Sequence, residues 1–396
     1  MKKITLFLFA GIIAIAANSQ TKSKTNQNLM WDGVQRQYIE IVPSDNSVAK
    51  PVLFCLHGIG GNMQEFGNII PENAPDWFYI VPEALNYTAQ LYGNDINMGN
   101  AWNVGATASV MGFQFPINST VDDAGFLMAI LDSLEHHFNI ATDSVFFCGF
   151  SLGAFMSNRM AIEHSDRIAA IASVSGTKGN DMLSATPVGN ISVLQIHGTA
   201  DPVVDYASGN ANLSGVPVLG TVNTPFGIGA EANVEYWKSF NNCATEAIVY
   251  DYPTNIANRT CKRYVYPDGD NGSRVAFIQV ENGTHSWYAS EAQQGIHYFN
   301  EIIKFFRNQW EEAPSSNPFS EQNSKENVTI FPNPASTYLC VNTENNNAVL
   351  EIFNSLGEKV LETKLNNFNN NIDISRIKSG RYIVRVNNYV QSIIVR

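Results

Sequence analysis

The sequence GFSLG at residues 149–153 limits the possible folds of this 396-residue chain more than any other segment. It follows an apolar run at 144–148 that has the character of a buried strand, and it precedes a stretch at 154–164 with helical spacing. A serine nucleophile has to be exposed on a sharp turn between a strand and a helix, and glycine on either side lets that turn form without a Cβ clash. The segment therefore predicts Ser151 as a nucleophile at the end of a strand.

A serine nucleophile needs a histidine base and an acid that orients the base. Of the seven histidines, His285 lies in a loop between a predicted strand and the last predicted helix, whereas the others lie on predicted helices or before the candidate acid. Asp201 follows the predicted strand 192–196, so the chain order is serine, aspartate, histidine. Asp205, four residues further on, is the alternative acid.

Acyl transfer passes through an oxyanion that needs two backbone N–H donors. Leu152 follows the nucleophile directly and is the first predicted donor. The loop HGIGGN at 57–62 follows an early predicted strand, and we predict the N–H of Ile59 as the second donor, with Gly60 as the alternative. His57 would then support this loop through hydrogen bonds.

Three aromatic residues are candidates for an apolar substrate pocket: Trp102, Phe150 and Trp287. Phe150 is the neighbour of the nucleophile, and Trp287 lies two residues from the candidate base. Large aromatic side chains with a few polar groups are typical of ligand pockets.

Short apolar runs alternate with amphipathic stretches through the centre of the chain, which predicts an α/β domain over 20–312 with a mostly parallel sheet flanked by helices. The predicted strands are 51–56, 77–81, 144–148, 169–173, 192–196, 248–252, 260–266 and 275–280, and the predicted helices are 121–138, 154–164, 231–240 and 296–310. Residues 313–327 are polar without periodicity and predict a linker. Residues 328–396 have short alternating strands with Asn-rich turns, which predicts a small all-β module.

The N-terminal residues 1–19 resemble a secretory signal peptide, because two lysines precede an apolar run and small residues at a cleavage site. The run is too short for a membrane span, and no later segment predicts one. The net charge of -12 argues against nucleic acid or an anionic membrane as a partner. We therefore expect a secreted protein.

Export would permit disulfides among the five cysteines. Cys243 and Cys261 flank a polar, loop-rich stretch, and the sequence leaves open whether they pair. The chain contains no CxxC pair, so we predict no metal site, and no motif predicts a cofactor.

Five segments together resemble the polyhydroxybutyrate-depolymerase-like esterases, which include feruloyl and acetylxylan esterases of carbohydrate esterase family 1. The strings LHGIGGN, VDDAGFL, FFCGFSLGAFMSNRMA, HGTADPVVDY and GTHSWY occur in order within residues 31–308. The resemblance implies the α/β-hydrolase fold, and the family's triad motifs fall on Ser151, Asp201 and His285.

The histidine motif departs from the family pattern, which usually has more glycine and a proline after the tryptophan, whereas here Thr284 precedes the base and Tyr288 follows Trp287. The resemblance implies a carboxylic ester substrate, either a feruloyl or acetyl ester of plant polysaccharide or, as the alternative, a polyhydroxyalkanoate or other polyester. A non-catalytic binding protein on the same fold is the alternative of another class. Such a protein would tolerate loss of a triad residue, and none is lost here.

The C-terminal region 328–396 contains FPNPA at 331–335, IFNSLG at 352–357, IDIS at 372–375 and SGRYIV at 379–384. In order and spacing these motifs resemble the type A sorting domain of type IX secretion substrates in the Bacteroidota. The resemblance implies the type IX secretion machinery as a partner and export across the outer membrane.

Overall fold

The computed structural model describes residues 23–310 and 328–395, except for 92, 111, 213–222, 254–255, 257, 332–334, 344–347, 355–357, 366–368 and 388. The predicted signal peptide and the predicted linker lie outside the described residues. The chain divides into two compact units, residues 1–314 and 315–396.

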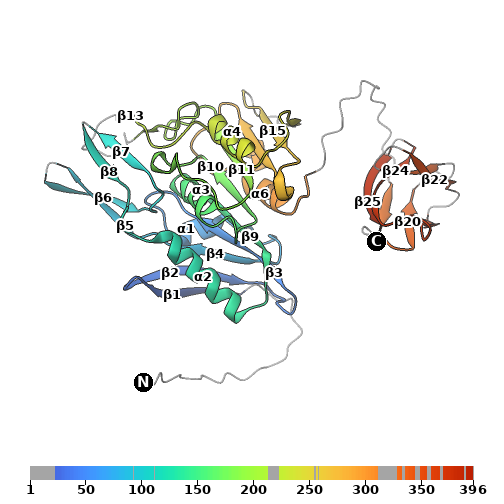
Figure 1. The fold of residues 1–396 in the computed structure, drawn as a ribbon, viewed down its shortest axis with the longest axis horizontal. Coiled ribbons are helices and arrows are strands. Elements are labelled where there is room, and N and C mark those ends of the chain that lie inside the picture. Colours follow the sequence, from blue (N-terminus) through green and yellow to red (C-terminus); the bar gives the residue numbers. More distant parts are fainter. Residues whose placement is uncertain are drawn as a thin grey trace, which may run out of the picture. The chain divides into compact units, whose positions relative to one another are not determined.

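The larger unit contains a sheet of ten strands among its described residues (Figure 1). Their order across the sheet is β1 (Ser23–Trp31), β2 (Val34–Val42), β4 (Phe78–Pro82), β3 (Lys50–Leu56), β9 (Ile140–Phe150), β10 (Ala170–Val174), β11 (Ser192–Gly198), β16 (Val275–Val280), β15 (Cys261–Tyr266) and β14 (Ile248–Tyr252). The central pairs from β4 to β16 are parallel, and the pairs outside them are antiparallel. The predicted mostly parallel α/β sheet is therefore confirmed.

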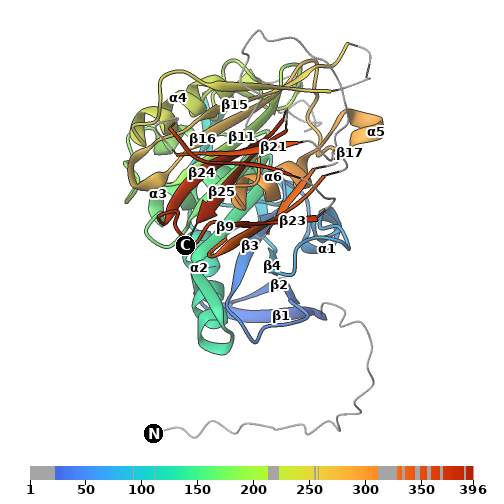
Figure 2. The same ribbon diagram turned by 90° about the vertical axis from the view of Figure 1, so that its right-hand side faces the viewer.

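Helices cover both faces of this sheet because its central strands are apolar on both faces. They are α1 (Met63–Phe66), α2 (Asp123–His137), α3 (Leu152–Glu163), α4 (Ala230–Phe240), α5 (Glu291–Gln294) and α6 (Tyr298–Phe306), with the 3₁₀ turns η1 (Gly67–Ile69), η2 (Asn180–Met182) and η3 (Asp270–Gly272). One core joins α2, α3 and α4 to side chains such as Phe54 of β3, and a second core joins α1 and α6 to the alternate side chains such as Leu53. Figure 2 shows these two groups of helices on opposite sides of the sheet.

Short two-stranded elements lie around the carboxyl ends of the parallel strands. They are β5 (Asn86–Leu91) with β6 (Asn94–Asn100), β7 (Thr107–Val110) with β8 (Phe113–Pro116), β12 (Ala211–Asn212) with β13 (Asn223–Thr224), and β17 (Ala289–Ser290) with β18 (Ile296–His297). The β17–β18 pairing holds Ile296 and His297 in extended conformation, so the last helix begins at Tyr298 and not at 296 as predicted. No helix in the described part of the chain is long and apolar enough to cross a membrane.

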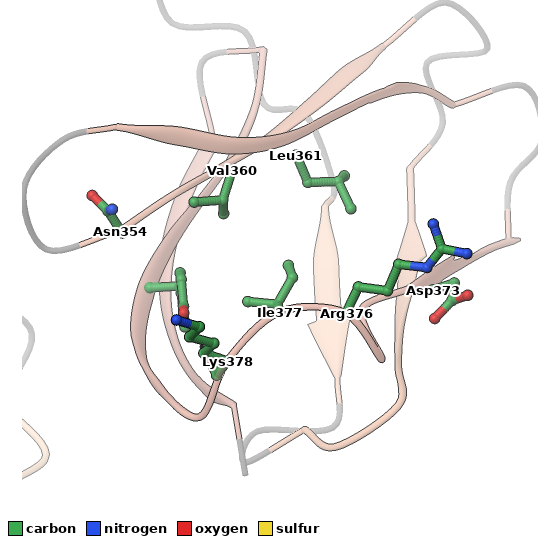
Figure 3. A pocket seen from close by; sticks show the side chains of 8 residues that line it. Asn354, Val360, Leu361, Asp373, Arg376, Ile377 and Lys378 are labelled. Atoms are coloured by element: carbon green, nitrogen blue, oxygen red, sulfur yellow. Dashed lines mark hydrogen bonds between the residues drawn. The ribbon is translucent and has the colours of Figure 1, made fainter.

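The smaller unit consists of two antiparallel sheets around a common apolar core. One sheet has β19 (Thr329–Phe331), β20 (Tyr338–Asn342) and β23 (Asn369–Asp373), and the other has β22 (Lys359–Lys364), β21 (Val349–Phe353), β24 (Gly380–Val386) and β25 (Tyr389–Val395). A pocket of about 420 Å³ opens between β22 and the loop before β24, with Val360 and Leu361 facing Ile377 (Figure 3). The eight residues that line it include neither serine nor histidine, so nothing in the pocket resembles a hydrolase site.

Candidate active site

Ser151 lies on the sharp turn between β9 and α3, as the sequence predicts. Its backbone has φ 55° and ψ −121°, a conformation that costs a non-glycine residue roughly 1–3 kcal/mol. A Cβ on Gly149 would overlap the backbone of Gly153, and a Cβ on Gly153 would overlap the carbonyl of Leu56 in β3. The two glycines are thus required because the turn packs against itself and against the neighbouring strand.

Asp201 and His285 are brought together, although they stand 84 residues apart in the chain. Nδ1 of His285 lies 2.8 Å from Oδ2 of Asp201, and the backbone N–H groups of Val203 and Val204 donate to Oδ1, each over 2.9 Å. The alternative acid, Asp205, instead accepts hydrogen bonds from the backbone and hydroxyl of Ser208. The structure therefore pairs the histidine with Asp201.

The loops that carry this pair are joined through their backbones. The N–H of Ala200 donates to the carbonyl of Gly283 over 3.0 Å, and the N–H of Asn282 donates to the hydroxyl of Thr199 over 2.9 Å. A Cβ on Gly283 would lie 2.9 Å from the Cα of Gly198, so only glycine allows this approach. The distance between acid and base is therefore set by backbone contacts.

The carboxylate of Asp201 remains ionised despite being buried. Burial alone acts to raise its pKa, but hydrogen bonds from His197 and His285 and the N–H of Val204 outweigh that effect, so the pKa lies well below its usual value. A permanent negative charge therefore faces Nδ1 of His285 at neutral pH.

The base lies beside the nucleophilic turn. The ring of Phe150 is 4.8 Å from the His285 ring, centroid to centroid, which places the imidazole next to the residue that precedes Ser151. The described residues include no hydrogen bond between Ser151 Oγ and this ring. Such catalytic hydrogen bonds often form only when the substrate is bound.

The loop 57–62 lies against the nucleophile. A Cβ on Gly58 would be 3.2 Å from the Cβ of Ser151. The N–H of Gly60 donates to the carbonyl of Asn100 over 2.8 Å, which removes it as an oxyanion donor. Among the described residues no acceptor faces the N–H of Ile59 or of Leu152, so both predicted donors are available.

His57 supports this loop from beneath. It is 1% exposed, its Nδ1–H donates to the carbonyl of Gly58 over 2.7 Å, and its Nε2 accepts the N–H of Ala84 over 3.1 Å. Burial lowers the pKa of His57 to about 4, against a smaller opposing effect of the Gly58 hydrogen bond. The imidazole is therefore neutral at neutral pH and serves as a donor and an acceptor at once.

The prediction that Trp102 contacts substrate is wrong. Its side chain is fully buried, with 0% exposed, and its indole N–H donates to the carbonyl of His57 over 2.9 Å. An indole that fills a core position under the loop is not accessible to a ligand. Trp102 therefore helps to hold the loop 57–62.

Phe150 and Trp287 are both partly exposed and lie close together. Their rings meet edge to face with centroids 6.4 Å apart, and Phe66 of α1 packs on Trp287 at 5.5 Å. This aromatic group (Phe66, Phe150 and Trp287) adjoins His285 through Phe150. Sequence reasoning missed Phe66, since no motif marks it.

None of the five cysteines, all of which the structure describes, forms a disulfide. Cys243 and Cys261, whose pairing the sequence left open, are both free. Cys55 and Cys148 are also free and lie opposite each other on β3 and β9, with their sulfur atoms 3.7 Å apart.

Each of the two compact units contains one family match. Residues 36–214 match the phospholipase/carboxylesterase family, a segment that includes Ser151 and Asp201, and residues 329–396 match the secretion system C-terminal sorting domain. Together with the sheet order, the first match shows the α/β-hydrolase fold. The second match indicates an extracellular or cell-surface protein.

Curated relatives carry esterase names. Feruloyl esterase C of Emericella nidulans is 28% identical over 214 residues, which cover 52% of this chain and 70% of that protein. Feruloyl esterase B of Piromyces equi is 26% identical over 193 residues, covering 48% and 32%. The chain spans 65%, 68% and 58% of the length of three further relatives. A solved structure, the CE1 ferulic acid esterase of Anaeromyces mucronatus, is 16% identical with a TM-score of 0.40, covering 74% of this chain and 94% of that one.

Proposed function

We propose that this α/β-hydrolase with a sorting domain is an exported serine ester hydrolase that uses Ser151, His285 and Asp201. The observation that carries the proposal is the 2.8 Å contact between Asp201 and His285, formed beside the strained turn that presents Ser151. The carboxylesterase match over residues 36–214 supports the same reaction class.

In the proposed reaction Nε2 of His285 takes the proton of Ser151 while Nδ1–H stays bonded to Asp201. The serine oxygen attacks the ester carbonyl, and the resulting oxyanion accepts the free N–H groups of Ile59 and Leu152. Collapse of this intermediate releases the alcohol, which takes its proton from His285, and leaves an acyl-enzyme. Water activated by the same histidine then releases the acid.

For the substrate we propose a feruloyl or acetyl ester of plant polysaccharide. Relatives named feruloyl esterases support this class, and the partly exposed rings of Phe150 and Trp287 would contact the flat ring of a cinnamoyl acid. A polyhydroxyalkanoate or other polyester is the alternative, and it would place an aliphatic chain against the same side chains. The sorting domain supports a proposed route through the type IX secretion machinery, which would read residues 329–396.

The test compares purified parental protein with Ser151→Ala on a short-chain nitrophenyl ester. We expect the variant to lose several orders of magnitude in turnover, because triad members act as a unit. Equal turnover by both proteins would refute the nucleophile, and no turnover by the parental protein would favour the non-catalytic alternative. Methyl ferulate, acetylated xylan and hydroxybutyrate oligomers, assayed side by side, distinguish the substrate classes.

A further inference from the structure

A buried polar network reaches Asp201 through His197. It runs from Asn158 of α3 through Asn233 of α4 to Gln195 and His197 of β11, and all four side chains are 0% exposed. Nδ2 of Asn233 donates to Oδ1 of Asn158 over 3.3 Å and to Oε1 of Gln195 over 2.9 Å. The network ends at His197, whose Nε2 is 3.5 Å from Oδ2 of Asp201.

Backbone groups fix the direction of every hydrogen bond in this network. The N–H of Lys178 can only donate, so the atom of Asn233 that it meets at 3.1 Å is the oxygen. The carbonyl of Gly176 can only accept, so the atom of Gln195 at 2.9 Å is the nitrogen. That nitrogen has a second hydrogen, which faces Nδ1 of His197 at 3.4 Å.

The tautomer of His197 follows from these directions. Nδ1 accepts from Gln195, and Nε2 lies 3.0 Å from the carbonyl of Val204, which requires a hydrogen on Nε2. The ring therefore donates from Nε2 and accepts at Nδ1. The same N–H lies near Oδ2 of Asp201, the oxygen that binds His285.

We propose that His197 is a positioning residue for the triad. Its Nε2–H, whose tautomer is fixed by the Gln195–Asn233 pair, keeps Oδ2 of Asp201 in contact with Nδ1 of His285. Val203 and Val204 bind only the other oxygen, Oδ1. Rotation of the carboxylate about that anchor is limited by His197 on one side and by His285 on the other. Without His197, the acid would still be anchored but free to turn away from the base.

The inference rests on the proposed function, so its test has one readout that does not depend on activity. The nitrogen chemical shifts of the His197 ring distinguish the Nε2–H tautomer from the Nδ1–H tautomer, and the signal is assigned by its loss in His197→Gln. We expect the Nε2–H form in the parental protein and a mixture of tautomers in Gln195→Met, which removes the donor to Nδ1. A parental ring with its proton on Nδ1 would overturn the proposal whether or not the protein is an esterase.

The activity test uses a matched pair of variants, because glutamine and methionine have similar volume but only glutamine can donate from about the position of Nε2. We expect His197→Met to lower kcat by roughly ten- to hundredfold with KM nearly unchanged, since a hydrogen bond to a charged group is lost. We expect His197→Gln to recover most of that loss, with both variants melting at similar temperatures. Parental kcat in His197→Met, or equal losses in the two variants, would overturn the positioning role. Full activity of Ser151→Ala would instead reject the proposed function and leave the tautomer test to decide.

Discussion

The buried neutral His57 should make the protein less stable in mild acid. In the unfolded chain an ordinary histidine takes a proton near pH 6.5, whereas burial lowers the pKa of His57 to about 4 in the folded state. Between these values the unfolded state binds more protons, so the free energy of unfolding falls as the pH falls through this window. Each pH unit contributes about 1.4 kcal/mol, which gives about 3 kcal/mol between pH 6.5 and pH 4.

Urea unfolding at several pH values between 7 and 4 measures this effect, and His57→Gln isolates it. Glutamine can still accept the N–H of Ala84 but cannot titrate, so the variant should be less stable at pH 7 and lose less stability on acidification. The difference between the two slopes should approach one proton. Parallel curves for parental protein and variant would show that His57 titrates normally and that burial does not lower its pKa.

Three further outcomes follow from the site and from the division of the chain. Asp201→Asn should reduce kcat of ester hydrolysis by about three to four orders of magnitude through loss of charge and of the correct tautomer. Asp205→Asn should have little effect because the Asp205 side chain accepts from Ser208 and does not meet the histidine, and the reverse ranking would refute the acid assignment. Gly198→Ala should lower both kcat and the melting temperature, because the new Cβ would overlap the Gly283 carbonyl. Gly189→Ala is the control that should change neither, because the nearest atom to its new Cβ would be the Ser165 hydroxyl at 3.8 Å. Removal of residues 313–396 should leave a folded, active enzyme in solution but abolish export in the native host. Loss of soluble enzyme on truncation would contradict the independence of the two units.

Much of the fold was predictable because its central strands are short, mostly apolar runs. The runs at 51–56 and 192–196 have the length and composition of buried strands, and GFSLG indicated where one strand turns into a helix. The acid and the base followed from chain order once the serine was assigned. The observed Asp201–His285 contact agrees with that order, and its geometry could not be read from the sequence.

The errors and omissions have physical causes. Trp102 was misplaced because an aromatic residue near a site can lie in the core or in the pocket, and composition does not distinguish them. The hairpin of β5 and β6 was overlooked, although residues 86–91 alternate polar and apolar side chains as a half-buried strand does. The role of His197 depends on partners from α4 and from the loop after β10, which only the folded chain brings together.

The hairpin formed by β5 and β6 has one consequence for engineering. Gly99 packs so closely on Gly60 that a Cβ there would lie 2.7 Å from the Gly60 Cα, and Asn100 bonds to Gly60 and Gly61 through its carbonyl and side chain. The base of the hairpin is thus packed on and bonded to the loop 57–62. Grafting a hairpin from another esterase should succeed only if the junction keeps Gly99 and Asn100.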